Sequence, residues 1–234
     1  MRLLTSLIVL LLCCSTANAQ WLTKDRVQNN QNFDKRLFSW GYYFGINSFD
    51  FDFDYIEQQE DIQVERSTGF NVGLIGNLRI SEYIDLRTEP GLAITQRDLM
   101  YENEPRFENE RDLLREVSST YIYLPLSVRL NTKRLNNVRP FVSFGVATAI
   151  NLSSNQDNPD DNFSGQFRTT TNPFFYELGI GMDFYLYYFK FTPSVKGVFA
   201  ASNELVPDNR PDSPWTGNLS SIQSRGVFLN FTFQ

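Results

Sequence analysis

Eight stretches of this chain alternate apolar residues with polar or small ones at a spacing of two. That spacing puts one set of side chains on each face of a β-strand, whereas an amphipathic helix needs a period of 3.6. The stretches begin near Phe38, Gly69, Ile84, Tyr121, Val142, Phe174, Phe189 and Gly226. Their lengths suit a tilted strand that crosses a bilayer with about 9–11 residues. The pattern predicts an all-β fold.

The connections between these stretches alternate in length. Long connections cover about residues 50–66, 95–118, 151–172 and 203–221, and short ones lie near Ser81–Glu82, at Lys133 to Val138 and at Leu186–Tyr187. Long loops on one side and short turns on the other are typical of an outer-membrane barrel with both termini in the periplasm. Residues 37–234 are therefore predicted to form an eight-stranded antiparallel transmembrane outer-membrane β-barrel. Side chains fill the interior of a barrel of this size.

Several charged residues lie within the strands, and the cost of exposing them to lipid decides where they point. A Lys or Arg on the lipid face near mid-bilayer costs about 2–4 kcal/mol. The predicted inward set is Arg79, Asp85, Arg87, Glu89, Arg129, Glu177, Asp183, Lys190 and Lys196. Because acids and bases nearly balance, the sequence favours a lumen held by structural ion pairs. The alternative is a path for protons or a substrate.

The hairpin around Leu186–Tyr187 predicts two of these ion pairs. A two-residue turn there would place Asp183 opposite Lys190 and Glu177 opposite Lys196. Opposite charges on facing residues stabilise antiparallel strands. An even-sized turn also explains why the inward residues change from odd to even numbers across this hairpin.

Three prolines, Pro90, Pro125 and Pro193, fall inside predicted strands. Proline has no N–H to donate to the hydrogen-bond ladder of a sheet. We therefore expect bulges or locally open pairing at these positions.

The first nineteen residues resemble an export signal. Met1–Arg2 is a short positive start, Leu3 to Leu12 is almost wholly apolar, and Ala17–Ala19 fits the small-x-small cleavage rule. The apolar run is too short to cross a bilayer. We expect cleavage after Ala19, which leaves residues 20–36 as a periplasmic N-terminal segment. A lipoprotein is the alternative, but Leu12 before Cys13 fits its cleavage rule poorly.

The chain contains no His, and its two cysteines, Cys13 and Cys14, lie in the predicted signal. Histidine is the usual general base and a frequent metal ligand, so the commonest chemistry of active sites is missing. Ser118 and Ser119 lie near the predicted outer rim with no evident base beside them. We therefore expect no enzyme activity, no catalytic residue, no cofactor and no metal.

The charge of the chain is negative, with a formal net charge of −6. A nucleic-acid-binding protein needs a basic face, so nucleic acid is not an expected partner. Alternating Asp and Phe from Asp50 to Asp54 predict a first strand that projects above the bilayer with its polar face outward. A calcium loop would need Gly where Tyr55 stands. The acidic loops are solvated surfaces, bind lipopolysaccharide through divalent cations, or contact a partner protein.

The barrel pattern, taken with particular stretches of sequence, resembles the PorT family of the Bacteroidota. The stretches that carry the resemblance are Asn32–Tyr55, Gly69–Leu92, Ser119–Ser154, Phe174–Ala201 and Arg225–Gln234, which together cover most of the chain after the signal. The resemblance implies an outer-membrane component of the type IX secretion system, needed for secretion of cargo proteins and for gliding in motile members. It implies no catalytic residues.

Two other classes of function stay open beside this resemblance. One is a stand-alone structural or adhesion barrel, although residues 20–36 are too few for a wall-binding domain. The other is a lipid-modifying barrel enzyme. Expected partners are outer-membrane lipids, lipopolysaccharide and other type IX secretion proteins. The sequence indicates no oligomeric state.

Overall fold

The computed structural model describes residues 28–57, 61–101, 107 and 112–234. The predicted signal, residues 1–19, lies outside these ranges, as does the first part of the predicted segment 20–36. None of the described helices is long and apolar enough to cross a membrane.

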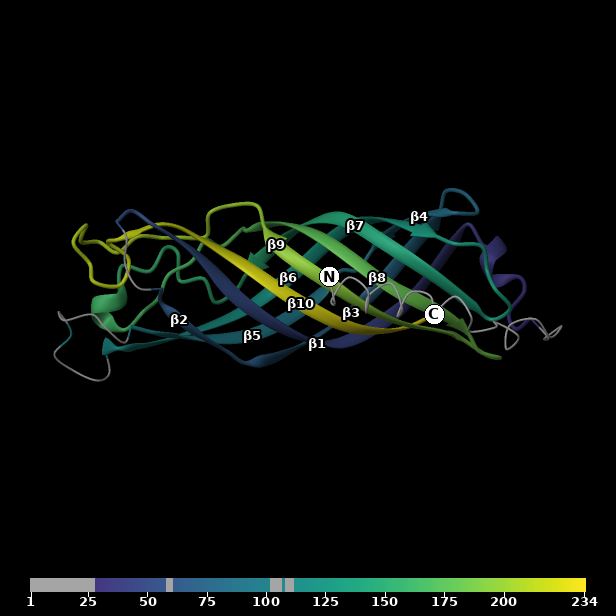
Figure 1. The fold of residues 1–234 in the computed structure, drawn as a ribbon, viewed down its shortest axis with the longest axis horizontal. Coiled ribbons are helices and arrows are strands. Elements are labelled where there is room, and N and C mark those ends of the chain that lie inside the picture. The colour runs from purple at the N-terminus through teal and green to yellow at the C-terminus, as the bar shows by residue number, and fades with distance from the viewer. Residues whose placement is uncertain (1–27, 58–60, 102–106, 108–111) are drawn as a thin grey trace, which may run out of the picture.

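Ten strands form one closed antiparallel sheet, a barrel whose strands run obliquely to its long axis (Figure 1). The elements are η2 (Phe33–Lys35), β1 (Phe38–Tyr55), β2 (Gln63–Arg66), β3 (Thr68–Arg79), β4 (Ile84–Thr88), β5 (Gly91–Met100), β6 (Leu114–Asn131), β7 (Val138–Asn151), η4 (Asn162–Ser164), β8 (Phe174–Tyr185), β9 (Lys190–Ala200) and β10 (Leu219–Phe233). Pairing of β1 with both β3 and β10 closes the ring.

The ten strands occupy eight positions around the barrel, because two of these positions are each shared by two consecutive strands. β2 and β3 follow one another along β5, separated at Ser67. From the pair Arg66–Arg97 to the pair Phe70–Ile94, one strand advances four positions and the other three, so β2–β3 carries a bulge. β4 and β5 follow one another along β6 in one unbroken register. The predicted eight-stranded antiparallel barrel is confirmed.

The second division lies at Pro90, where the pairing opens locally as expected. Neither β3 nor β6 changes register across the gap between Thr88 and Gly91, so no bulge forms there. Pro125 faces the same gap from β6, and its carbonyl oxygen accepts a hydrogen bond from Thr88 Oγ1 at 2.7 Å. Pro193 lies where the pairing of β8 with β9 is interrupted, between Gly181–Ser194 and Phe184–Phe191. The missing N–H groups therefore coincide with openings in the ladders.

The two faces of the wall separate as the alternation predicts. In β1 the outward residues from Phe38 to Ile46 are exposed and apolar, while the inward residues from Ser39 to Phe51 are buried. The other strands continue this exposed apolar band around the barrel, with residues such as Leu74, Leu126 and Ile180. A closed ring that turns an apolar band outward satisfies its own backbone, which is what a bilayer requires of a spanning sheet.

The barrel has a short-turn end and a long-loop end, which lie at opposite ends of its axis (Figure 1). Two of the expected long loops are shorter than predicted, because strands occupy much of residues 50–66 and 95–118. β1 continues to Tyr55 with Phe51 buried inside and Asp52 outside. A sheet with an apolar inner face and a polar outer face is stable in water, so β1 can continue beyond the bilayer. The outer face of β1 changes from apolar to polar at Asp50. This change marks the edge of the apolar band and not the end of the strand.

The predicted register of the last short hairpin is wrong by two residues. Its turn spans four residues, Leu186 to Phe189, so that Tyr185 pairs with Lys190. Lys196 therefore faces Gly179 and not Glu177. A four-residue turn leaves the same side chains inward as a two-residue turn, which is why the alternation could not distinguish them.

Candidate functional site

The lumen holds a cluster of ionised side chains near its centre. The ammonium of Lys196 lies between two carboxylates, donating to Glu89 and, at 3.3 Å, to Glu177 Oε1. The guanidinium of Arg87 donates through Nε to Glu89 Oε1 at 2.6 Å. Tyr123 adds a hydroxyl to Glu177 Oε2 at 3.3 Å. All of these side chains are buried, so each charge depends on its partner.

A second cluster lies nearer the short-turn end. Asp183 accepts from Arg129 and, at 2.6 Å, from the hydroxyl of Thr192, while Lys190 Nζ stands 3.8 Å away. Asn131 donates to Asp85 Oδ2 at 2.9 Å and accepts from Arg129 Nε at 2.8 Å. The guanidinium of Arg129 also stacks on Phe141, with its carbon 3.5 Å from the ring centroid.

The structure thus brings together eight of the nine residues expected inside. Asp183 contacts Lys190, and Glu177 contacts Lys196, but both pairs are formed diagonally, because the register of the hairpin differs from the predicted one. Arg79 does not join either cluster. It is half-buried at the rim, and its Nε donates to the carbonyl oxygen of Ser81 at 3.2 Å.

An aromatic layer fills the lumen on the long-loop side of these clusters. Phe49 packs edge-on against Phe228, and Tyr121 packs edge-on against Phe175. Tyr123 contacts Phe175 and Phe228 and so joins this layer to Glu177. The side chains come from strands on different sides of the ring, so the layer spans the width of the barrel.

Arg97 is a buried charge that the sequence did not assign to the lumen. Its guanidinium donates to Ser224 and Ser119 hydroxyls at 2.8 Å each and stacks 3.8 Å from the ring centroid of Phe51. Ser119 therefore serves as an acceptor for Arg97. The inward alternation continues from Ala93 through Arg97, and this signal was present in the sequence. Arg97 was not assigned to the lumen because the strand was expected to end near residue 95.

Glu204 is a second buried charged residue that the sequence analysis did not assign to the interior. It follows β9 in the last long connection, is fully buried, and accepts from Ser224 N at 2.9 Å and Ser224 Oγ at 3.1 Å. Burial raises the pKa of Glu204 above its ordinary value, an effect that the charge of Arg97 partly offsets.

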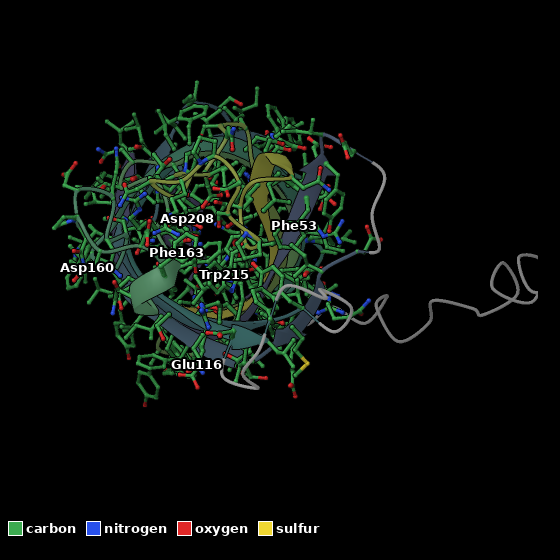
Figure 2. All side chains as sticks on the ribbon, turned by 90° about the vertical axis from the view of Figure 1, so that its left-hand side faces the viewer. Phe53, Glu116, Asp160, Phe163, Asp208 and Trp215 are labelled. Carbon is green, nitrogen blue, oxygen red and sulfur yellow. The ribbon has the colours of Figure 1, made fainter. Side chains whose placement is uncertain are left out.

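The long loops fold over the lumen and close the long-loop end. Figure 2 looks onto this end and shows Trp215, Phe163 and Asp208 within the ring, with Glu116 and Asp160 toward its edge. Trp215 packs edge-on against Phe163 at 5.0 Å between centroids, and the guanidinium of Arg115 stands 4.6 Å from its ring centroid. Asp208 ties the loops together.

The bonds of Asp208 hold its own connection in shape and join it to the connection between β7 and β8. Its carboxylate accepts from Ser213 Oγ at 2.5 Å, from Thr216 Oγ1 at 2.9 Å and from Asn162 Nδ2 at 2.9 Å. Asn162 begins η4, so the two long connections before and after β8–β9 are held to each other. We call this assembly around Trp215 and Asp208 the loop cap.

The segment before β1 folds back over the short-turn end. Asp34 accepts from Tyr185 OH at 2.5 Å and forms ion pairs with Arg134 at 3.2 Å and Arg139 at 3.5 Å. Asn29 N donates to Asn137 Oδ1 at 2.9 Å. We call residues 28–36 the N-terminal strap. With the loop cap it covers the two ends of a lumen that side chains fill.

The outside of the long-loop end carries the acidic residues expected there. Arg225 donates to Asp50 at 3.1 Å and to Asp52 at 3.2 Å, and Arg66 lies 3.8 Å from Asp50. Among the residues that the structure describes, no group of three or more His, Cys, Asp or Glu side chains is arranged to hold a metal ion.

Comparison with known proteins places this architecture in a family. A model described as an outer membrane protein beta-barrel domain matches residues 18–206. The chain belongs to this family and is an outer-membrane β-barrel protein. No curated protein sequence matches it.

Solved outer-membrane proteins are similar over most of their length. OprG from Pseudomonas aeruginosa is 13% identical with a TM-score of 0.45, covering 84% of this chain and 93% of that chain. Ail of Yersinia pestis is 14% identical with a TM-score of 0.38, covering 83% and 96%. The Neisserial surface protein A is 9% identical with a TM-score of 0.38, covering 82% and 95%. Likeness at this level carries no argument about function.

Proposed function

We propose that this outer-membrane barrel is a non-enzymatic accessory component of the type IX protein secretion system, acting in secretion of cargo proteins and in the associated gliding motility. The resemblance of five stretches, from Asn32 to Gln234, to the PorT family supports the system. The filled lumen supports the accessory role.

The filled lumen is the single observation that carries the accessory role. A folded or extended cargo chain needs an open path. Here the two ionic clusters and the aromatic layer fill the lumen, and the loop cap and the N-terminal strap cover its two ends. Eight-stranded barrels enclose a space that side chains fill. Cargo therefore passes elsewhere, and this protein acts through its loops, its lipid-facing wall or its short-turn end.

The lengths of the connections support an orientation of the barrel in the membrane. Outer-membrane barrels place short turns in the periplasm and long loops outside, so the N-terminal strap and Gln234 are proposed to face the periplasm. Single cysteines at Asp61, Asn158 and Asp212 should react with an impermeant maleimide in whole cells, whereas one at Asn136 should stay protected. The reverse pattern would invert the proposed orientation.

The proposed partners are outer-membrane lipids, lipopolysaccharide and other type IX secretion proteins. The outer surface around Asp50 and Asp52 carries acids paired with Arg225, and a surface of mixed charge supports docking to another protein. Ion pairs at such exposed positions contribute about 0–1 kcal/mol each, so the surface is not required for folding.

Gene deletion tests the secretion role. Loss of the protein should abolish secretion of a reporter carrying a C-terminal type IX signal, and the wild-type gene supplied in trans should restore it. A reporter exported by another route serves as the control. Undiminished secretion of the tagged reporter in the deletion strain would rule out the proposed role and favour a structural or adhesion barrel. Release of modified lipid A by the purified protein would overturn the non-enzymatic assignment.

A further inference from the structure

We propose that a notch in the barrel wall at the short-turn end binds an extended segment of a partner protein, which adds a short strand to the free edge of β1. This inference does not rest on the proposed secretion role. It rests on the unequal lengths of the pairings of β1, on the cavity beside them and on the position of Arg36.

The free edge arises because the two neighbours of β1 end at different levels. β3 pairs with β1 from Phe38 onward, but β10 pairs with it only from Tyr42 onward. Gly41 lies against Phe233 and Gln234 at the end of β10, so only the residues from Phe38 to Trp40 have a strand on one side alone. At the end of β10, Gln234 and Lys190 exchange hydrogen bonds of 2.8 and 3.0 Å, so this end is bound to β9.

The peptide groups on the open side can be identified. Arg79 N donates to the carbonyl oxygen of Leu37 at 2.8 Å, so the peptide groups of residues 37, 39 and 41 point toward β3. Those of Phe38 and Trp40 point the other way, into the notch. Edge groups of this kind are a template for another strand, and neither proline nor lysine interrupts this edge.

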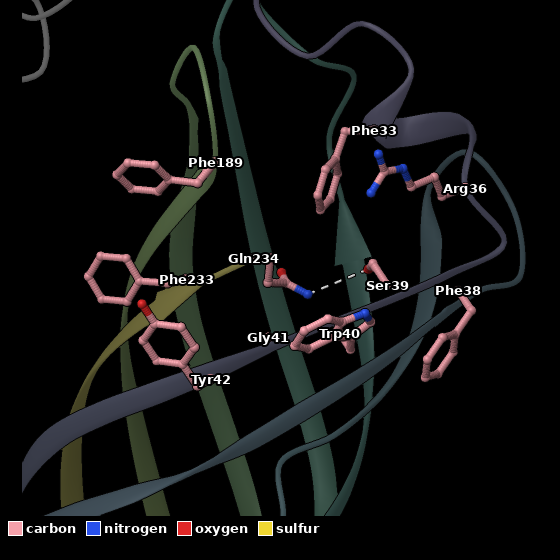
Figure 3. Close-up of a pocket in the computed structure, with 10 residues that line it drawn as sticks. All are labelled: Phe33, Arg36, Phe38, Ser39, Trp40, Gly41, Tyr42, Phe189, Phe233 and Gln234. Atoms are coloured by element: carbon pink, nitrogen blue, oxygen red, sulfur yellow. Dashed lines mark hydrogen bonds between the residues drawn. The ribbon is translucent and has the colours of Figure 1, made fainter.

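A cavity of about 610 Å³ lies beside the edge (Figure 3). Its apolar lining comprises Phe33, Phe38, Trp40, Tyr42, Phe189 and Phe233. The indole of Trp40 is 73% exposed, which leaves a large aromatic surface beside the free peptide groups. This surface continues into the exposed apolar band of the wall.

Arg36 gives the notch a positive charge at its strap side. Figure 3 shows its guanidinium beside Phe33, and the guanidinium carbon lies 5.6 Å from that ring's centroid. No carboxylate of the described residues forms an ion pair with Arg36, in contrast to Arg134 and Arg139, which share Asp34. A carboxylate from outside the described chain would complete the site.

A peptide fits these observations better than a lipid does. An acyl chain would cover the aromatic rings, but it would leave the N–H and C=O groups of Phe38 and Trp40 without partners. An added strand satisfies both needs, since main-chain bonds hold it and alternate side chains enter the pocket. A strand in line with β10 runs antiparallel to β1 and reaches Arg36 last.

That geometry specifies the partner segment. Residues opposite Phe38 and Trp40 point outward into the aromatic cavity and are apolar. The residue between them faces Ser39, whose hydroxyl already accepts a hydrogen bond from Gln234 Nε2 at 3.5 Å, so it is small. An acidic side chain or a terminal carboxylate follows, within reach of Arg36. The occupant is therefore an extended apolar–small–apolar segment that ends in an acid.

Photo-crosslinking tests the proposal. p-Benzoylphenylalanine replaces Phe189, across the notch from the free edge, in the full chain in intact outer membranes. We expect a protein adduct whose crosslinked peptide has the predicted pattern. Trp40→Pro removes the N–H on the open side and should lower the adduct yield several-fold below that of Trp40→Ala, which keeps it. Proline is tolerated where its missing N–H faces away from the sheet.

Two further pairs of variants keep the test decisive. Phe38→Pro against Phe38→Ala repeats the comparison at the end of the strand, should Trp40→Pro fail to reach the membrane. Arg36→Gln should lower the yield several-fold, whereas Arg66→Gln, at the opposite end of the barrel, should leave it unchanged. An adduct with lipid, an adduct with a second copy of this chain, or equal yields from the proline and alanine variants would each overturn the proposal.

Discussion

At the scale of single residues, the lumen depends on charges that cannot reach water. Asp183 is 1% exposed and neutralises Arg129, with Lys190 nearby. Removing one partner of a buried pair leaves the other uncompensated, which costs far more than the pair contributes when intact. The same reasoning applies to Lys196 between Glu89 and Glu177.

Asp183→Asn tests this dependence. The change should lower the free energy of unfolding by about 3–5 kcal/mol, because the buried guanidinium of Arg129 then loses its ion-pair partner. Urea unfolding in lipid vesicles, followed by tryptophan fluorescence, measures the loss. Asp52→Asn breaks an exposed pair with Arg225 and should cost about 1 kcal/mol or less. Equal losses in the two variants would contradict the account of the lumen.

Glu204 should make stability depend on pH. Burial raises its pKa in the folded state above the value in the unfolded chain, so its contribution favours folding at low pH and is lost as the pH rises through the folded-state pKa. Glu204→Gln removes this dependence, so the stability of the wild type relative to the variant should fall as the pH rises above the ordinary pKa of a glutamate side chain. Urea unfolding at a series of pH values, from acidic to neutral and above, measures the difference. Glu116→Gln, on the exposed face of β6, is the control, and parallel pH profiles for Glu204→Gln and wild type would refute the expectation.

At the scale of strands, the barrel is narrow enough for side chains from strands that are not neighbours to contact one another. Asn71 of β3 donates to Asn230 of β10 at 2.6 Å, although β1 lies between these strands. The bond passes over Gly45 of β1, where a Cβ would lie closer than 3.0 Å to atoms of Asn230 and Leu229. Glycine at this position is a requirement of close approach.

Gly45→Ala should therefore destabilise the barrel. Forcing a methyl group against Asn230 and the β10 backbone costs about 1–3 kcal/mol, as overpacking does elsewhere. Gly76→Ala is the matched control, because the nearest atom to its Cβ is the side-chain carbon Cγ2 of Thr88 at 3.3 Å. The midpoint of urea unfolding should fall for the first variant and change much less for the second. A larger shift for Gly76→Ala would contradict the packing argument.

The faces of the strands could be predicted from the sequence, but their register and ends could not. Period-two alternation and the cost of charge in lipid are local signals, and they assign Asp183 and Lys196 inward whatever the turn. The position of the turn at Leu186–Phe189 depends on local backbone geometry. The alternation of apolar and polar residues does not predict that geometry. Strand ends were missed because β5 continues to Arg97 and beyond after the outer face becomes polar.

At the scale of the whole molecule, the loop cap and the N-terminal strap depend on contacts that local sequence patterns do not predict. Asp34 reaches Arg134 and Arg139, about a hundred residues away in sequence, and Asp208 joins η4 to the last long connection. Such contacts join segments that are far apart in sequence, so no local pattern reveals them. The sequence could therefore predict a filled barrel but not how its ends are covered.

If side chains fill the lumen, this barrel provides no path through itself and its role lies on its surfaces. Conductance of the purified wild-type protein in planar bilayers tests whether such a path exists. We expect a conductance equal to that of the protein-free bilayer at moderate voltage. Ion pairs and aromatic rings fill the lumen, and the loop cap and the N-terminal strap cover its ends. Long-lived openings with the conductance of a water-filled pore would show that the lumen is not filled.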